Sequence, residues 1–318
     1  MDANDIEVLY TYLSSQQTAR HYLYRCYQKL NISDAEIKSY ENCTPFMYYL
    51  EHGHQFYNNG KQMDYLLQPI LYFYGMIHLL KAALLTKRPD YPESTSMLAH
   101  GVSTRKRKKK NYTFLDDEVK PQHKGLFPYF SEHLFLLKKI PFSKIKMHQL
   151  LAILPELSGL FRIHDREKMI KVGTVHSRSL TFPCTILDDY NLTENTFIQR
   201  IKSYAPDIDY SESSSTMIDI RLKRPIHQSF GPFFVHMDRT IYFPKRREHF
   251  LTISEVMAHY LLLYNLSMLS RYEAEWWGEL LMTKSELDFP FISSFLNITA
   301  KKVPLLIGKE LLHELESF

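Results

Sequence analysis

The sequence is poor in glycine and in cysteine, and these shortages exclude several classes of site. Only 10 of its 318 residues are glycine, and it contains neither a G-x-x-x-x-G-K-[ST] phosphate loop nor a G-x-G-x-x-G dinucleotide turn. The three cysteines, Cys26, Cys43 and Cys184, lack C-x-x-C spacing, so neither a disulfide framework nor a zinc site is predicted. It also lacks an H-E-x-x-H helix and a Ser/His/Asp order. We therefore expect no cofactor, no metal and no nameable catalytic motif.

The N-terminus and the apolar segments predict a soluble, cytoplasmic protein that does not enter a membrane. The first residues, Met1–Asp5, are acidic and polar, whereas a secretory signal is basic and then apolar. The most apolar window, Leu66–Leu85, is long enough to span a bilayer but contains Gln68, His78 and Lys81. We interpret this window as a buried core helix.

Positive charge is concentrated in one segment. The net charge is +4, and more than all of it comes from six consecutive cations: Arg105, Lys106, Arg107, Lys108, Lys109 and Lys110. Asn111, Tyr112 and Phe114 follow, and they supply hydrogen-bonding and stacking groups of the kind that bind single-stranded RNA. The pattern predicts an anion-binding loop over residues 105–112. The alternative is a solvated loop whose charge is balanced by the acidic triplet 116–118.

Hydrophobic periodicity predicts a helical region over residues 1–158, with apolar side chains at helical spacing in the segments 6–30, 44–57, 63–86, 130–139 and 147–154. Thr44 followed by Pro45 is typical of a helix start. The periodicity stops between residues 87 and 124, and the length of this segment is typical of functional or disordered loops. The basic run lies inside it.

Beyond residue 158 the pattern changes to short runs rich in β-branched and aromatic residues, at 169–172, 180–187, 216–222 and 233–243. These runs predict one small, mostly antiparallel sheet. A helix over 194–204, with Thr193 at its N-cap, interrupts it. We therefore predict a predominantly helical α+β protein made of an N-terminal helical region, a β-rich insert and a C-terminal helical cap that packs on the first region: 1–158, 159–251 and 252–318.

Two further groups of side chains qualify as site residues. His78 and Lys81 share one face of the central helix, and with His100 they could line a polar pocket, although a satisfied core histidine is the commoner role. Arg271, Trp276 and Trp277 end an apolar helix. They either close the core or anchor an interface, because Trp and Arg dominate binding hot spots.

Weaker patterns predict no metal site. The H-x-H pattern of His52 and His54 places the two rings in diverging directions on a helix, which is unfavourable for metal binding. Glu255 and His259 are four residues apart, and in the absence of a third ligand we interpret them as a helix-surface pair.

The blocks Pro69–Gly75, Leu98–Lys109 and Tyr260–Trp277 resemble the YaaC-like family of bacterial proteins. The resemblance covers most of the chain and implies a bacterial, cytosolic context without a particular activity. An association of family members with an IMP dehydrogenase gene implies one alternative role, as a regulator of such a nucleotide-metabolism enzyme.

The segment Tyr72–Leu85 is similar to the central helix of HEPN domains, which carries an aromatic, small-residue and Lys-Ala-Leu-Leu pattern. This similarity implies a HEPN-like helical bundle that forms homodimers. Many HEPN domains are metal-independent ribonucleases that use an Arg and a His four to six residues apart in a helix. Arg221 and His227 have this spacing but fall in a predicted strand, so they are weak catalytic candidates.

These observations favour a non-catalytic binding or regulatory protein. Its basic loop would contact an anionic partner: RNA, a nucleotide or an acidic protein surface. A HEPN-type ribonuclease is the enzyme alternative.

Overall fold

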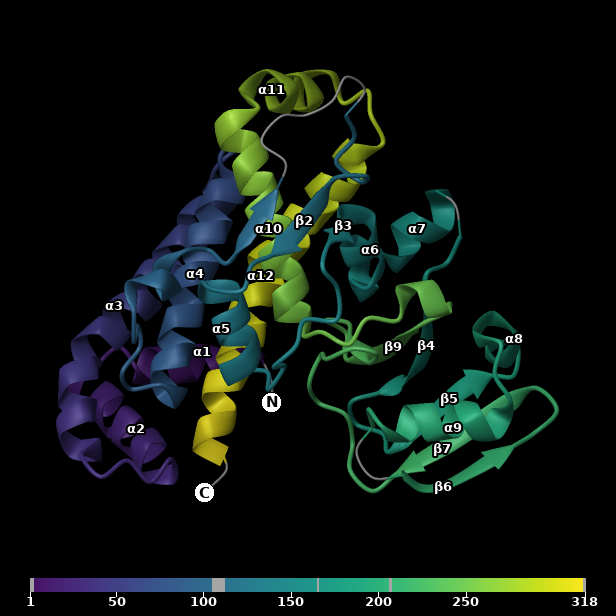
Figure 1. Ribbon diagram of the computed structural model, residues 1–318, viewed down its shortest axis with the longest axis horizontal. Helices are drawn as coiled ribbons and strands as arrows, with labels where there is room; N and C mark the ends of the chain where they lie inside the picture. Colours follow the sequence, from purple (N-terminus) through teal and green to yellow (C-terminus); the bar gives the residue numbers. More distant parts are fainter. Residues whose placement is uncertain (1–2, 105–111, 165, 206–207, 317–318) are drawn as a thin grey trace. The chain divides into compact units, whose positions relative to one another are not determined.

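The computed structural model describes residues 3–104, 112–164, 166–205 and 208–316 (Figure 1). The chain divides into two compact units. Unit 1 comprises Met1–Lys144 and His259–Phe318, and unit 2 comprises Ile145–Ala258. Helices account for 57% of the structure, which confirms the predominantly helical α+β class. The β-rich insert expected at 159–251 lies within unit 2, and the C-terminal helices belong to unit 1.

Unit 1 is a helical bundle whose helices are α1 (Ala3–Tyr12), α2 (Gln16–Lys29), α3 (Ala35–Gln62), α4 (Gln68–Lys87), α5 (Leu126–His133), α10 (Glu255–Tyr272), α11 (Ala274–Thr283) and α12 (Asp288–Glu316). The first turn of α10 belongs to unit 2. In Figure 1, α4 lies between α3 and α12, and it packs on both. α4 is long and apolar enough to cross a membrane, but 72% of its apolar window is buried. Its interpretation as a core helix is confirmed.

The segment 6–30 forms two helices rather than the one predicted. α1 ends at Tyr12, and the Ser14 hydroxyl donates a hydrogen bond to the Thr11 carbonyl at 2.7 Å. This bond satisfies one of the carbonyls that a helix end leaves unpaired. α1 packs on α12 whereas α2 packs on α3, so the break lets the two helices bury their apolar faces against different partners.

The expected helix start at Thr44 and Pro45 is wrong, because α3 begins at Ala35 and contains Pro45 in its interior. An internal proline removes one helical hydrogen bond and costs about 3 kcal/mol. Burial offsets that cost: α3 has one continuous buried stripe on both sides of the proline, made of Ala35, Ser39, Cys43, Phe46, Leu50, Gly53, Tyr57 and Gly60. Tertiary packing therefore overrides the local stop signal.

The segment 87–124, predicted to be irregular, contains a short 3-10 helix, η1 (Thr95–Leu98), and two strands, β1 (Val102–Thr104) and β2 (Glu118–Pro121). The strands pair antiparallel, with Val102 opposite Pro121 and Thr104 opposite Val119. The basic run 105–110 and Asn111 lie outside the described residues. The described chain on either side of them is therefore held in one short ladder.

Unit 2 contains two three-stranded antiparallel sheets, ordered β4-β9-β8 and β5-β7-β6, rather than the single sheet predicted. Its strands are β3 (Ile145–Lys146), β4 (Met169–Thr174), β5 (Ser179–Pro183), β6 (Ile208–Ser213), β7 (Met217–Leu222), β8 (Phe234–Val235) and β9 (Thr240–Pro244). Its helical segments are α6 (Met147–Ala152), η2 (Pro155–Leu157), α7 (Ser158–His164), α8 (Ile186–Tyr190), α9 (Glu194–Lys202) and η3 (Arg247–His249). The sequence did not predict β6, because its side chains are mostly polar and exposed and lack the apolar pattern of a buried strand.

The core of unit 2 is aromatic. The Phe182 ring lies 5.2 Å from the rings of Phe197 and Phe243, measured between centroids. α9 begins as predicted, because the Thr193 side chain accepts a hydrogen bond from the backbone N–H of Thr196. The predicted strand 180–187 is shorter than expected, since its last residues form α8.

The C-terminal end of α12 is fixed to α2 and α4. The Tyr22 hydroxyl donates to the Leu311 carbonyl at 2.8 Å, and Lys29 donates to the Glu314 carbonyl. Lys87, at the end of α4, pairs with the Glu314 carboxylate, which is largely buried. Leaving either charge of such a pair without its partner is costly in a dry environment.

Replacing Glu310 in this region by Gln should remove a pH dependence of stability. The pKa of the Glu310 carboxyl is raised to about 7, chiefly by burial and to a smaller extent by Glu314, while Lys87 and Lys309 oppose the shift. Between the ordinary pKa of 4.5 and the folded value of about 7, the folded protein holds a proton that the unfolded chain has lost. The free energy of unfolding of the wild type should therefore fall as pH rises through this window.

Glu310→Gln keeps the shape of the side chain but cannot lose a proton, so it should be more stable than the wild type above pH 7, by up to about 3 kcal/mol. Urea denaturation followed by circular dichroism, at about pH 5 and pH 8, measures the difference. Glu279→Gln, at an exposed position, is the control and should follow the wild type. Identical pH profiles for the wild type and Glu310→Gln would contradict the argument.

Candidate functional site

The chain that follows the basic run is anchored by buried carboxylates. The Tyr112 hydroxyl donates to Oδ2 of Asp117 at 2.8 Å, and the fully buried Asn265 side chain donates to the same oxygen at 2.9 Å. The Asp288 carboxylate accepts the backbone N–H groups of Phe114 and Leu115 at 2.5 and 3.1 Å. Residues 112–117 therefore form a stem that is fixed to α10 and α12. We call these residues the loop stem.

An aromatic side chain lies beside the loop stem. The ring of Trp276, in α11, is 4.9 Å from the Tyr112 ring and nearly perpendicular to it. Trp276 is partly exposed, whereas Trp277 is fully buried and donates its indole N–H to the Leu66 carbonyl at 3.3 Å. Of the two tryptophans among the three predicted interface candidates, Trp277 is therefore a core residue, and Trp276 is partly exposed next to the loop stem.

The acidic triplet 116–118 has partners in the described chain. Glu118 forms an ion pair with Lys144 at 3.0 Å. Asp117 accepts the two side-chain hydrogen bonds of the loop stem and the N–H of Glu118 at 2.9 Å. Asp116 accepts a hydrogen bond from the Thr113 hydroxyl at 3.3 Å. These contacts give the triplet a structural role within the described chain.

A second group of candidate residues lies on the outward face of α4. Tyr74, His78 and Lys81 are spaced by four and three residues, which places them on one side of the helix. The His78 ring packs on Phe56 of α3, with centroids 5.6 Å apart and an interplanar angle of 14°. The Lys81 ammonium lies 5.5 Å from the centre of the Tyr49 ring, also on α3. Close aromatic contact of this kind stabilises a cation without a carboxylate.

His100 and Arg271 lie on the other side of Tyr74. The His100 ring is 6.3 Å from the Tyr74 ring and 5.8 Å from that of Tyr264. The Arg271 guanidinium donates to the Tyr74 hydroxyl at 3.2 Å and to the Ser267 carbonyl at 2.9 Å. The structure therefore brings the pocket candidates His78, Lys81 and His100 onto one surface and adds Arg271 to it. We call Tyr74, His78, Lys81, His100 and Arg271 the α4 face.

The electrostatics of the α4 face are set by burial and by positive neighbours. The pKa of His78 is lowered to about 4, chiefly by burial and also by the charges of Lys81 and His52. Burial also lowers the pKa of His100, and Arg271 and Lys81 add to that shift. The pKa of Lys81 is lowered by burial alone. At neutral pH the surface therefore holds two neutral imidazoles, the Arg271 cation and a partly desolvated lysine.

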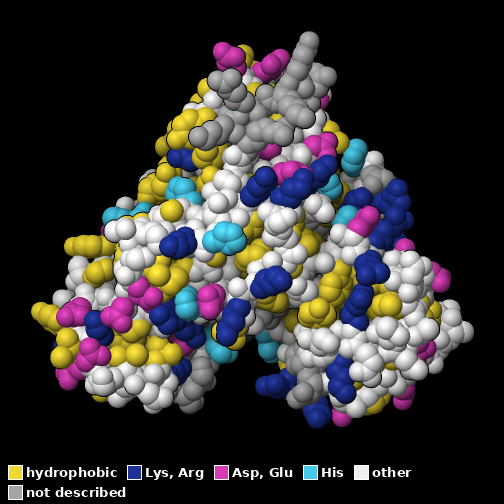
Figure 2. Space-filling model, viewed as in Figure 1, with side chains coloured by type: hydrophobic (Ala, Val, Ile, Leu, Met, Phe, Trp, Pro, Cys, Tyr) yellow, Lys and Arg dark blue, Asp and Glu magenta, His cyan; other side chains and the backbone are white. Residues whose placement is uncertain are grey.

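The cations of the α4 face are not balanced by salt bridges within the part of the chain that the structure describes. Among the described residues, no carboxylate forms an ion pair with His78, Lys81, His100 or Arg271. A pairing of Arg271 with the nearby Glu273 or Glu275 would have been ordinary for a helix end, but the guanidinium turns to Tyr74 instead. Figure 2 shows cationic and acidic side chains together on the face of the protein that is drawn there.

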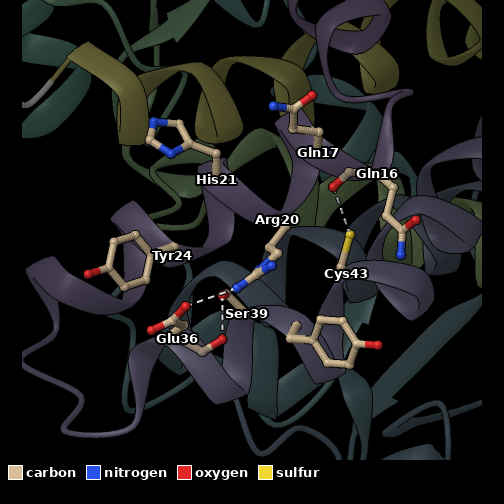
Figure 3. A pocket seen from close by; sticks show the side chains of 9 residues that line it. Gln16, Gln17, Arg20, His21, Tyr24, Glu36, Ser39 and Cys43 are labelled. Carbon is tan, nitrogen blue, oxygen red and sulfur yellow. Dashed lines mark hydrogen bonds and ion pairs between the residues drawn. The ribbon is translucent and has the colours of Figure 1, made fainter.

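A polar pocket of about 630 Å³ opens between α2 and α3. Figure 3 shows that Arg20 reaches Glu36, with which it pairs at 3.1 Å, and that the Cys43 thiol contacts the Gln16 carbonyl. Burial raises the pKa of the Cys43 thiol, which disfavours the reactive thiolate. The charges of this pocket are satisfied internally, so it is a weaker candidate than the α4 face.

The weak catalytic candidates lie in unit 2. Arg221 is exposed on β7 and donates to the Ser179 hydroxyl at 3.3 Å, and His227 is exposed in the loop that follows. Since only one of them lies in a regular element, and that element is a strand, they do not share a helix face. The structure also corrects the expected surface pair, because Glu255 and His259 are both fully buried. The described residues include no group of three potential metal ligands.

Sequence reasoning placed Tyr74 on the helix face of His78 and Lys81, but it missed the other residues that hold the site in place: Phe56, Asp117, Asn265 and Asp288. In the sequence, Asp117 lies in the acidic triplet, which was interpreted as balancing the charge of the basic run. Asn265 lies in an apolar helical run. A buried amide or carboxylate in such a run requires a polar partner, and that requirement is the only signal that marks them in advance.

Fold and site together define a class: an α+β protein with a small β-rich unit and a helical unit. The helical unit carries a cationic face whose charges form no ion pair with a described carboxylate. Residues 11–311 match the family model described as YaaC-like Protein. The chain therefore belongs to the YaaC-like family, which confirms the resemblance carried by its three sequence blocks. No curated protein and no solved structure matches the chain.

The two adjacent tryptophans should respond differently to truncation. Trp277→Ala removes a fully buried ring and its hydrogen bond to Leu66, so we expect a loss of roughly 3–5 kcal/mol in the free energy of unfolding. Trp276→Ala removes a partly exposed ring and should cost about 1 kcal/mol. Urea denaturation of both variants gives the comparison, and equal losses would show that the ring of Trp276 is also part of the core.

Proposed function

We propose that this protein binds single-stranded RNA through unit 1, without cleaving it. The observation that carries the proposal is the loop stem. Its buried carboxylates and Asn265 fix the chain next to six consecutive cations, and Trp276 presents a partly exposed ring at the same place. A concentrated positive charge combined with an accessible aromatic ring suits the phosphates and bases of a single strand.

The composition of the loop favours RNA over the other two anionic partners. A free nucleotide carries too few phosphates to engage six cations. An acidic protein surface would not need aromatic groups beside the charge, whereas unpaired bases stack on them. A protein partner, including an enzyme of nucleotide metabolism, remains the competing form of the proposal and is an outcome of the experiment below.

The HEPN-like bundle, the cytoplasmic location and the homodimer are part of the same proposal. The packing of α4 between α3 and α12 is compatible with a HEPN-like bundle in a cytoplasmic protein. A homodimer would use the exposed side of α11, near Trp276 and Arg271. No observation favours the HEPN-type ribonuclease, since Arg221 and His227 lie on a strand and in a loop of unit 2.

Replacing residues 105–110 by Gln and Ser should abolish RNA binding while leaving the fold intact. If about four of the six cations contact phosphates, the logarithm of the wild-type affinity should fall with the logarithm of salt concentration at a slope near −3. Fluorescence anisotropy with a labelled single-stranded oligonucleotide measures both quantities. Circular dichroism should show the same melting temperature for the variant and the wild type.

The matched control is the double variant Lys138→Gln and Lys139→Gln, which removes exposed positive charge elsewhere in unit 1 and should keep most of the affinity. Affinity that does not depend on salt, or equal losses in the control and the loop variant, would defeat RNA binding at this loop. Retention of an acidic protein from lysate after nuclease treatment, together with no RNA affinity, would favour the protein partner.

His227→Ala should leave any RNA cleavage by the purified protein unchanged, because His227 is exposed in a loop and does not share a helix face with Arg221. A cleavage assay in the presence of a chelator tests this. Robust metal-independent cleavage that this single change abolishes would replace the binding proposal with the ribonuclease.

A further inference from the structure

The α4 face has unused hydrogen-bonding capacity. Nδ1 of His78 is buried and has no hydrogen-bond partner among the described residues. The Lys81 ammonium has three N–H groups, and its contact in the described chain is with the Tyr49 ring rather than with an acceptor. Leaving the N–H groups of the partly buried Lys81 unpaired costs free energy, and a ligand that pairs them recovers that cost.

The charge of the α4 face restricts the chemistry of that ligand. The Arg271 guanidinium donates to the Tyr74 hydroxyl, and the Tyr74 ring lies 6.3 Å from the His100 ring. The positive charges of Arg271 and Lys81 both lower the pKa of His100. Since no described carboxylate forms an ion pair with either cation, they favour an anion and disfavour a metal ion. Lys81 supplies a point charge, while Arg271 supplies a planar donor, and this combination suits the oxygens of a phosphate group.

The aromatic side chains restrict the ligand further. Phe56 contacts the rings of both His78 and Tyr74, at 5.6 and 6.4 Å between centroids. Tyr49 lies 5.9 Å from His78 on the other side. Aromatic rings from α3 and α4 therefore lie beside the cations on one side of the surface. Flat unsaturated groups bind aromatic rings by stacking and by edge contacts.

We infer that the α4 face binds a small phosphate monoester that carries a flat ring. Lys81 and Arg271 contact the phosphate, His78 and His100 donate hydrogen bonds to it, and Phe56 and Tyr49 border the ring. The site uses none of the residues of the basic run or the loop stem. It is therefore separate from the proposed RNA-binding function and holds whether or not that function does.

Binding should change the protonation of His78. A phosphate dianion stabilises the imidazolium form, so the pKa of His78, about 4 in the free protein, should rise in the complex. The charged and titratable groups that act on His78 are Lys81 and His52, and both oppose protonation in the free protein. The imidazole signals in NMR spectra follow this change directly, and His78→Gln assigns them.

Phenyl phosphate is the probe, and inorganic phosphate and benzoate are its two controls. Isothermal titration calorimetry should show that phenyl phosphate binds more tightly than either, because only it combines a ring with a dianion. Lys81→Gln should weaken phenyl phosphate about tenfold, as expected for the loss of one charge-assisted contact of roughly 1.4 kcal/mol. Lys81→Arg should restore much of the affinity, and Lys301→Gln, at an exposed position of α12, should have no effect.

Three results would overturn the inference: no binding of phenyl phosphate at millimolar concentration, equal binding by wild type and Lys81→Gln, or no change in the His78 titration on binding. The variant in which residues 105–110 are neutralised separates the two proposals. This loop variant should keep its affinity for phenyl phosphate and lose its affinity for RNA. Lys81→Gln should lose affinity for phenyl phosphate and keep its affinity for RNA. Loss of phenyl phosphate affinity in the loop variant would show that the probe binds the basic run instead.

Discussion

The candidate site depends on the close approach of α3 and α4. Both helices carry a glycine where they meet: a Cβ at Gly53 would lie 2.6 Å from Leu79, and one at Gly75 would lie 2.9 Å from Tyr57. Only a residue without a side chain fits at this distance. The approach brings the rings of Tyr49 and Phe56 over His78 and Lys81, so it creates the aromatic border of the α4 face as well as the core.

Burial then decides which charges this surface can tolerate. Partial burial keeps His78 and His100 neutral, so two further positive charges are avoided beside Lys81 and Arg271. The remaining cations are stabilised by aromatic rings and by the Tyr74 hydroxyl rather than by carboxylates. Cation–aromatic contacts of this kind stabilise a charge by amounts comparable to those of surface salt bridges.

The sequence was informative where a pattern is local. The apolar run of α4 and the Thr193 cap are read directly from neighbouring residues, and the structure confirms both. The interior position of Pro45 was not predictable, because it depends on a stripe that α3 buries against other helices. The same limit applies to the site: His78 and Lys81 share a helix and were grouped correctly, but Arg271 joins them only through tertiary packing.

The loop stem shows why the acidic triplet was the hardest part to interpret. In the sequence, 116–118 follows a basic run, and charge alternation of this kind indicates a solvated, self-balancing segment. In the fold, Asp117 accepts hydrogen bonds from Tyr112 and the buried Asn265, and Glu118 pairs with Lys144. The carboxylates of this segment therefore fix the chain through specific hydrogen bonds and an ion pair, and their role depends on residues far away in the sequence rather than on the neighbouring charges.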